Sequence, residues 1–172
     1  MNDTEGTIAR KICLNLGASK PIGNKFVDAV VKESFDVFTF ETALSYVSLP
    51  PRNSPATSVT QGKETDTLET YQRVFQFLKD RHVKKIFRVI VNDLTDRPHT
   101  DEMIISLLKE FDVEHWEWKK LDMNSEAIYE AAPRVKTVSL HSSGNYSALQ
   151  GWACETGLII LNNVCSASIE AM

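Results

Sequence analysis

The sequence predicts an α/β domain with a mostly parallel sheet and single-helix crossovers. Stretches with strand character alternate along the chain with stretches of helical periodicity, and single helices separate successive strands. Strands joined in this way need crossover connections, which place them parallel in one sheet. A strand spacing of roughly 22 to 27 residues also falls within the period of leucine-rich repeats. A leucine-rich-repeat-like curved parallel sheet is therefore the alternative architecture.

The N-terminal part, residues 1–49, is predicted to be a small β-α-β unit. Apolar and polar residues alternate over 11–16, as in a strand, and apolar residues recur at helical spacing over 23–34. Residues 36–40 and 43–49 look extended, and a Pro-Pro pair then ends the unit.

Residues 50–65 are predicted to be a flexible loop. They hold too little apolar surface to offset the entropy lost on ordering them. The loop separates the N-terminal unit from a main α/β unit over 66–172, and the two units together form one compact domain.

The main unit begins with a predicted helix over 66–81. The strongest strand follows over 85–91, and its nearly continuous β-branched run is typical of a strand buried on both faces. Thr100 then caps a helix that runs to Phe111, because a threonine before two acidic residues suits a helix start. The remaining predicted elements are a strand over 113–118, a helix over 125–132, a strand over 134–140, a short helix over 146–154 and a last strand over 158–161.

Charge and composition exclude several classes of protein. The net charge is −4 and no basic stripe occurs, which argues against nucleic-acid binding. No apolar run approaches the roughly 20 residues of a membrane span, and the N-terminus is polar and acidic. Three cysteines at no useful spacing indicate reduced thiols. We expect a cytoplasmic protein without a cofactor.

Residues 16–23, Leu-Gly-Ala-Ser-Lys-Pro-Ile-Gly, follow a predicted strand and precede a predicted helix. They look like the glycine-rich turn of short-chain dehydrogenases. Pro21 replaces the middle glycine, and its fixed φ and missing N–H suit a cofactor poorly. The Tyr-x-x-x-Lys pair of that family is also missing. A strand-to-helix turn is the favoured interpretation.

Acidic residues and one imidazole gather after the strongest strand, at the edge of the sheet where α/β proteins bind ligands. Asp93, His99 and Asp101 are candidate ligands of a divalent metal there, beside Asp96 and Glu102. Turn formation and favourable charge at a helix start explain most of these residues equally well. A metal-binding or small-molecule-binding protein remains an alternative function.

Three tryptophans are ambiguous. Trp116 and Trp118 share one face of their strand, and Trp152 follows Gly151. Exposed indoles would form a candidate partner surface, whereas indoles beneath a helix would belong to the core, which is the commoner case.

The run His141-Ser142-Ser143-Gly144-Asn145, with Cys154 nearby, invites a nucleophile hypothesis. A serine nucleophile needs a base, an orienting group and oxyanion donors within hydrogen-bond reach. A strand that ends in a polar turn accounts for the same residues, so we expect no catalytic residue here.

Residues 12–160 resemble the region upstream of the catalytic domain in intracellular subtilisin-like serine proteases (peptidase S8 family) of filamentous fungi. Four ordered segments carry the resemblance: residues 40–50; residues 83–94 with 98–102; residues 113–122 with 125–128 and 131–133; and residues 143–145 with 149–152. The fourth segment departs from the family pattern, because His141 and Ser142 stand where aromatic residues are expected and Tyr146 stands where Asn is expected.

This resemblance implies a non-catalytic protein. In such proteases the catalytic domain follows this region, and its Asp-Ser/Thr-Gly, His-Gly-Thr and Gly-Thr-Ser strings do not occur here. We therefore expect a stand-alone, non-enzymatic relative that acts as a protein-interaction or regulatory module, or is a remnant. An accessory protein of a fungal secondary-metabolite gene cluster is an alternative, and a short-chain-dehydrogenase-like nucleotide binder is the least favoured one.

Overall fold

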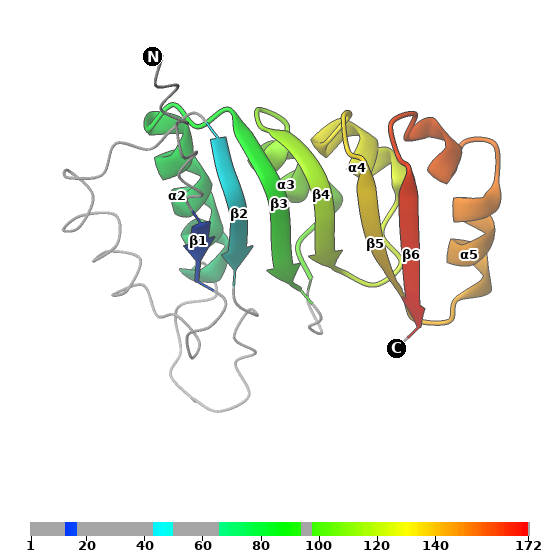
Figure 1. Ribbon diagram of the computed structural model, residues 1–172. Coiled ribbons are helices and arrows are strands. Elements are labelled where there is room, and N and C mark those ends of the chain that lie inside the picture. The colour runs from blue at the N-terminus through cyan, green and yellow to red at the C-terminus, as the bar shows by residue number, and fades with distance from the viewer. Residues whose placement is uncertain (1–12, 17–42, 50–65, 94–97, 172) are drawn as a thin grey trace, which may run out of the picture.

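The computed structural model describes residues 13–16, 43–49, 66–93 and 98–171 (Figure 1). The predicted helix over 23–34, the extended stretch over 36–40 and the predicted loop over 50–65 lie outside these residues. The described elements are β1 (Cys13–Asn15), β2 (Ala43–Leu49), α2 (Asp66–Asp80), β3 (Lys85–Asn92), α3 (Asp101–Leu108), β4 (Asp112–Lys119), α4 (Ser125–Ala131), β5 (Thr137–Ser142), α5 (Tyr146–Ala153), the 3-10 helix η1 (Leu158–Ile160) and β6 (Ser166–Ala171).

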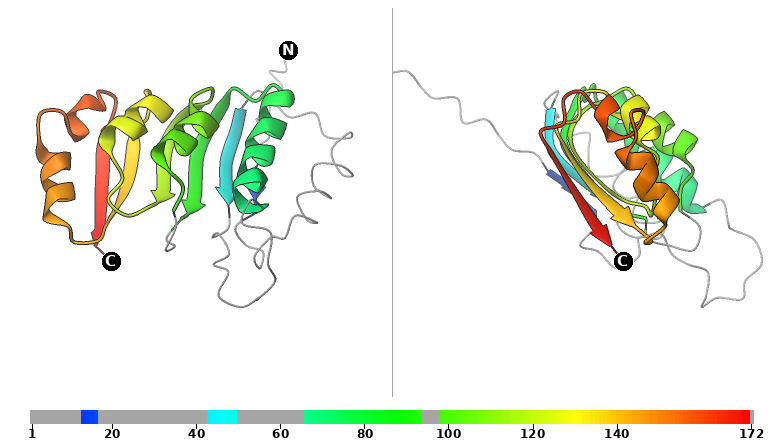
Figure 2. Two further views of the ribbon diagram at one scale, coloured as in Figure 1. Left: turned by 180° about the vertical axis from the view of Figure 1, so that it is seen from behind. Right: turned by 90° about the vertical axis from the view of Figure 1, so that its right-hand side faces the viewer.

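The six strands form one parallel sheet in which spatial order follows chain order, from β1 to β6. The predicted α/β fold with a parallel sheet is confirmed. Helices α2 to α5 all lie on one face of the sheet (Figures 1 and 2). Right-handed crossovers produce this arrangement whenever each new strand adds on the same side of the last one. The described helices thus match the leucine-rich-repeat-like alternative in covering one face, since a doubly wound sheet has helices on both faces.

Strands β2 to β5 and the residues just before β5 repeat one pattern of buried side chains. In each strand, apolar residues occupy positions i, i+3 and i+5. All of these side chains are at most 2% exposed and belong to the core. They are Leu44, Val47 and Leu49; Ile86, Val89 and Val91; Val113, Trp116 and Trp118; and Val135, Val138 and Leu140.

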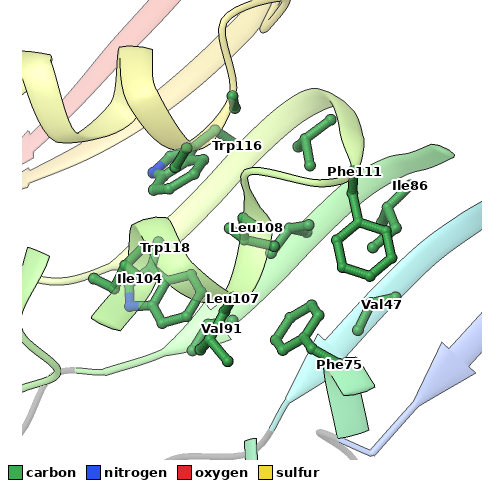
Figure 3. Close-up of a cluster of buried hydrophobic side chains, with 14 of the residues drawn as sticks. Val47, Phe75, Ile86, Val91, Ile104, Leu107, Leu108, Phe111, Trp116 and Trp118 are labelled. Atoms are coloured by element: carbon green, nitrogen blue, oxygen red, sulfur yellow. The ribbon is translucent and has the colours of Figure 1, made fainter. Parts of the chain in front are cut away.

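The core lies between the sheet and the helix layer. Phe75 and Leu78 of α2 pack against it, as do Ile104 and Leu108 of α3. Figure 3 shows part of this cluster, with Trp118 of β4 beside Ile104. The described helices cover this side of the sheet, and the buried apolar positions of each strand point towards them.

Side-chain caps set the starts of the helices in the main unit. The Thr100 hydroxyl accepts a hydrogen bond from the Met103 N–H at 3.3 Å, which confirms the predicted cap of α3. Asn124 and Asn145 cap α4 and α5 by accepting from backbone N–H groups two residues on. Each cap satisfies one of the helix N–H groups that lack a partner within the helix.

The predicted last strand over 158–161 is wrong. Residues Leu158–Ile160 form the 3-10 helix η1, and the last strand is β6, at Ser166–Ala171. The run Leu-Ile-Ile-Leu is apolar because Leu161 is buried and Leu158 packs against the core from the helix side. A short apolar run does not distinguish a strand from a tight helical turn.

The predicted burial of residues 85–91 on both faces is also wrong. Phe87 and Arg88 of β3 are exposed, whereas Val89 is fully buried. The helices cover one face of this strand, and none of the described elements covers the other.

Candidate functional site

None of the described helices lies on the other face of the sheet, which is the most prominent candidate site and which we call the front face. Its side chains lie between the buried positions of each strand; in β3, Phe87 and Arg88 are both exposed between buried Ile86 and Val89. One row of the front face is in register across all six strands, through Cys13, Tyr46, Arg88, His115, Thr137 and Ser166. Strands bonded side by side hold such a row at spacings of about 4.8 Å. The backbone thus fixes the spacing of these side chains without help from loops.

Glu114 of β4 is the centre of a charge network on the front face. Its carboxylate accepts hydrogen bonds from the ammonium groups of Lys85 on β3 and, at 2.9 Å, of Lys136 just before β5. These two bonds, that from Lys85 first, lower the pKa of Glu114 from the ordinary 4.5 to about 2. Glu114 therefore stays ionised in mildly acidic solution and joins three neighbouring chain segments.

A second ionic group lies further along β4. The Arg88 guanidinium donates to the Glu117 carboxylate, and the Lys119 ammonium lies 3.7 Å from the same carboxylate. Acidic and basic side chains are thus interleaved, and no large area of one sign results. Such a surface suits a protein partner with complementary charges better than a polyanion.

Phe87 is the exposed aromatic residue of this region. Its side chain is 46% exposed, and its ring centroid lies 4.5 Å from that of His115. The Arg88 side chain is 53% exposed although it is ion-paired. Aromatic and arginine side chains are the groups most enriched among residues that dominate protein interfaces. The sequence analysis did not identify Phe87 and Arg88 as candidate site residues. The one signal for them was an aromatic and a charged residue side by side within a mainly β-branched strand.

The tryptophans do not form a partner surface. Trp116 and Trp118 of β4 are each 1% exposed beneath the helix layer, and Trp152 of α5 is 5% exposed and belongs to the same core. The Trp152 indole donates to the Met123 carbonyl at 2.7 Å, which satisfies its buried N–H. The candidate partner surface at these residues is therefore wrong, and the alternative interpretation, core residues, is correct.

The candidate metal ligands are only partly brought together. Asp93 and His99 are buried and joined by a 2.9 Å contact between a carboxylate oxygen and Nδ1. Asp101 instead forms an ion pair with Lys120. Across the four described ranges, no three His, Cys, Asp or Glu side chains are placed to hold a metal ion. Asp96 lies outside these ranges.

Asp93 has a structural role that explains its burial. Its carboxylate accepts hydrogen bonds at 2.9 Å from the His99 backbone N–H and from the Trp118 indole. Its own N–H donates to the Lys119 carbonyl at 3.1 Å, and the His99 ring stacks on Tyr71 with centroids 4.7 Å apart. A buried carboxylate with this many donors fastens the end of β3 to β4 and to the start of α3.

The serine run does not form a nucleophile and base. The Ser143 hydroxyl donates to the Asp122 carboxylate, which also accepts from the Ser143 N–H at 3.0 Å. Both ring nitrogens of His141 are buried without a hydrogen-bond partner, and Nδ1 lies 3.6 Å from a carboxylate oxygen of Glu170. Burial lowers the pKa of His141 below its ordinary 6.5, with Glu170 opposing this shift. Asp122 thus ties the chain after β4 to the end of β5.

Cys154 lies apart from this run, at the end of α5. Its thiol is exposed and within 3.4 Å of the Thr156 hydroxyl. Hydrogen bonds from this hydroxyl and from nearby backbone N–H groups lower the pKa of Cys154 below its ordinary 9.0. The Cys154 thiol donates to the Gly151 carbonyl, the Ser143 hydroxyl donates to Asp122, and the His141 ring has no hydrogen bond, so the three groups do not form a catalytic unit.

The glycine-containing turn over 16–23 is described only at Leu16, so the predicted strand-to-helix turn lies outside the described residues. None of the helices in the described part of the chain has the length and apolar character that a membrane-spanning helix requires.

Comparison of the chain with protein-family models, with curated proteins and with solved structures finds no match.

Proposed function

We propose that this chain is a non-catalytic protein-interaction module that binds its partner through the front face. The observation that carries the proposal is the pair Phe87 and Arg88, both exposed at the middle of the sheet beside the ion-paired carboxylates of Glu114 and Glu117 on β4. When a partner binds, burial of the aromatic ring and of the guanidinium contributes affinity, and the surrounding fixed charges contribute specificity.

The front face is organised before a partner arrives. Glu114 and Glu117 already hold the ammonium and guanidinium groups of the adjacent strands. Side chains that are already ordered lose less conformational entropy when a complex forms. This preorganisation supports recognition of a folded partner surface in preference to a small molecule, which binds in concave, mostly apolar pockets.

The resemblance to the region upstream of fungal subtilisin-like catalytic domains suggests the partner to test first. Its segments fall on elements of the fold: residues 43–49 are β2, residues 85–92 are β3 and residues 112–119 are β4. These three strands carry Tyr46, Arg88 and His115 of the front row. We propose that the chain is a non-catalytic relative of that region and that a subtilisin-like catalytic domain is the protein it contacts.

The contacts of the candidate nucleophile support the non-catalytic part of the proposal. The Ser143 hydroxyl is hydrogen-bonded to a carboxylate and the nearby imidazole is buried without a hydrogen bond. A serine nucleophile instead needs an imidazole in hydrogen-bond contact with its hydroxyl.

Calorimetric titration with the purified catalytic domain of a fungal intracellular subtilisin-like protease, its nucleophilic serine replaced by alanine, tests this function. We expect binding by the wild type, and at least about tenfold weaker binding by the double variant Phe87→Ser, Arg88→Glu, because it removes the exposed ring and reverses a charge. The matched control is Tyr129→Ser on α4, since Tyr129 is 43% exposed, close to the 46% of Phe87, but lies in the helix layer.

Two results would contradict the proposal. One is the absence of any binding by the wild-type chain at concentrations near 100 μM, where contacts weaker than about 5 kcal/mol would be missed. The other is equal loss of affinity in the front-face variant and in Tyr129→Ser, which would place the contact elsewhere.

A further inference from the structure

The last strand leaves core positions uncovered. Ala167 and Ile169 of β6 are in register with Val138 and Leu140 of β5. Those two β5 residues are 0% and 1% exposed, whereas every residue of β6 is exposed and Ile169 is 50% exposed. The positions that face the core in β2 to β5 therefore continue into β6, where nothing in the described chain packs beyond them.

The outer edge of β6 also leaves backbone groups free. The N–H group of Ser166, the first residue of β6, points to β5, since it donates to the Lys136 carbonyl at 3.4 Å. N–H directions alternate along a strand, so those of Ala167 and Ile169 point away from β5. No described strand lies on that side of β6. Unpaired edge groups of this kind are a template for a further strand.

We propose that β6 pairs antiparallel with β6 of a second copy of this chain, which gives a two-fold dimer with one continuous sheet. The two-fold axis runs perpendicular to the sheet, so both helix layers lie on the same side. Natural edge strands usually carry proline, lysine or another device that blocks such pairing. Ser166–Ala171, Ser-Ala-Ser-Ile-Glu-Ala, contains neither residue.

Self-pairing is compatible with the charges of β6. Antiparallel pairing centred on Ser168 sets Ser166 opposite Glu170 and Ala167 opposite Ile169, whereas pairing centred on Ile169 sets Ser168 opposite Glu170. Both registers place the one charged residue of the strand against a serine, and apolar residues against each other on the helix side. A second copy thus supplies the apolar cover that Ala167 and Ile169 lack.

The end of the helix layer enlarges the contact. A stable interface buries about 1,000 Å² or more, which exceeds what two strands of this length cover by themselves. Helix α5 lies at the β6 end of the helix layer (Figure 1). It carries exposed Tyr146 and Leu149, and η1, just before β6, carries Ile159, which is 71% exposed. In the two-fold dimer the α5 helices approach each other beside the paired strands, where these side chains are buried.

Sedimentation equilibrium of the full chain tests the dimer. We expect the wild type to sediment at twice its 19.4 kDa mass at micromolar concentration. Ala167→Pro should weaken the self-association by about 100-fold or more, because each copy loses an outward N–H and gains a ring at the contact. The proline replaces a group that does not bond to β5, so the monomer is expected to keep its fold. Ala167→Val keeps the N–H and should remain dimeric.

A second variant keeps the test decisive if Ala167→Pro does not fold, as judged by its circular dichroism. Ile169→Lys changes a half-exposed side chain and should also give a folded monomer, since the dimer would bury one added lysine charge from each copy at the contact. A wild type that is monomeric at about 100 μM, a concentration corresponding to 5 kcal/mol of association, would overturn the proposal. So would a dimer that Phe87→Ser abolishes and neither β6 variant weakens. The dimer does not depend on the front-face partner, and either can fail alone.

Discussion

Glu114 is the residue at which the electrostatics of the front face can be tested most cleanly. Its pKa of about 2 lies below the ordinary 4.5, so at a pH between these values the folded chain binds fewer protons than the unfolded chain. The stabilising contribution of Glu114 is therefore complete above pH 4.5 and is lost as the pH falls towards 2. Lys85 and Lys136 are partly exposed, so solvent screening keeps this contribution modest.

Glu114→Gln should lower the free energy of unfolding at pH 7 by about 1 kcal/mol, because two ammonium groups lose their carboxylate. The variant should also lose less stability than the wild type between pH 4.5 and 2, since it lacks the group that titrates there. Urea unfolding at a series of pH values measures both effects. Glu130→Gln, which removes an exposed carboxylate from α4, is the control and should follow the wild type. A Glu114→Gln profile parallel to that of the wild type would show that the two lysines do not hold this carboxylate.

In strand β3, residues close together in the sequence differ sharply in burial, because the described helices cover one side of the strand. Val89 is fully buried under the helices, whereas Phe87, two residues away, is 46% exposed on the other side. The stability lost when a side chain is truncated should therefore depend on whether the helices cover that side chain, and not on its size.

Val89→Ala should destabilise the fold by about 2 kcal/mol, because it removes buried methyl groups and leaves a cavity. Phe87→Ala removes more atoms but should cost less than about 1 kcal/mol, since those atoms already contact water. Chemical denaturation of the two variants gives the comparison directly. A larger loss for Phe87→Ala would mean that part of the chain covers the front face.

The elements with strong local signals could be predicted from the sequence. Residues 85–91 are β-branched, Thr100 precedes two acidic residues, and residues 66–81 have helical periodicity; the structure has β3, α3 and α2 at these places. β6 could not be predicted, because all of its residues are exposed and its sequence therefore lacks the apolar pattern of the buried strands. The apolar run 158–161 was wrongly predicted as a strand, because its residues contact the core although they form a helical turn: Leu161, just after η1, is buried.

The candidate site could be predicted much less well than the elements. Burial of Trp116 and Trp118 and exposure of Phe87 both depend on which face of the sheet the helices cover. Which face the helices cover depends on the order of the strands in space, and this order is a long-range property of the chain. Helix and strand periodicity are local and do not determine it. The spacing of the strands indicated a parallel sheet, but it fitted one-sided and two-sided arrangements equally.

At the scale of the whole molecule, the sequential order of the strands determines both proposed contacts. Because each strand adds beside the last one, none of the described helices lies on the front face, and no described strand pairs with the outer edge of β6. Doubly wound sheets cover both faces and bind ligands at the point where the strand order reverses. This sheet has no reversal within its described strands, and the recognition surface that we propose is therefore the front face.

Site-specific photo-crosslinking tests the role of the front face most directly. Benzoylphenylalanine replaces Phe87 in one sample and Tyr129 in the other, two aromatic positions of similar exposure on opposite sides of the molecule. After irradiation with the inactive subtilisin-like catalytic domain, the account predicts a covalent adduct from position 87 and none from position 129. An adduct from position 129 alone, equal adducts from both positions, or no adduct from either would contradict it.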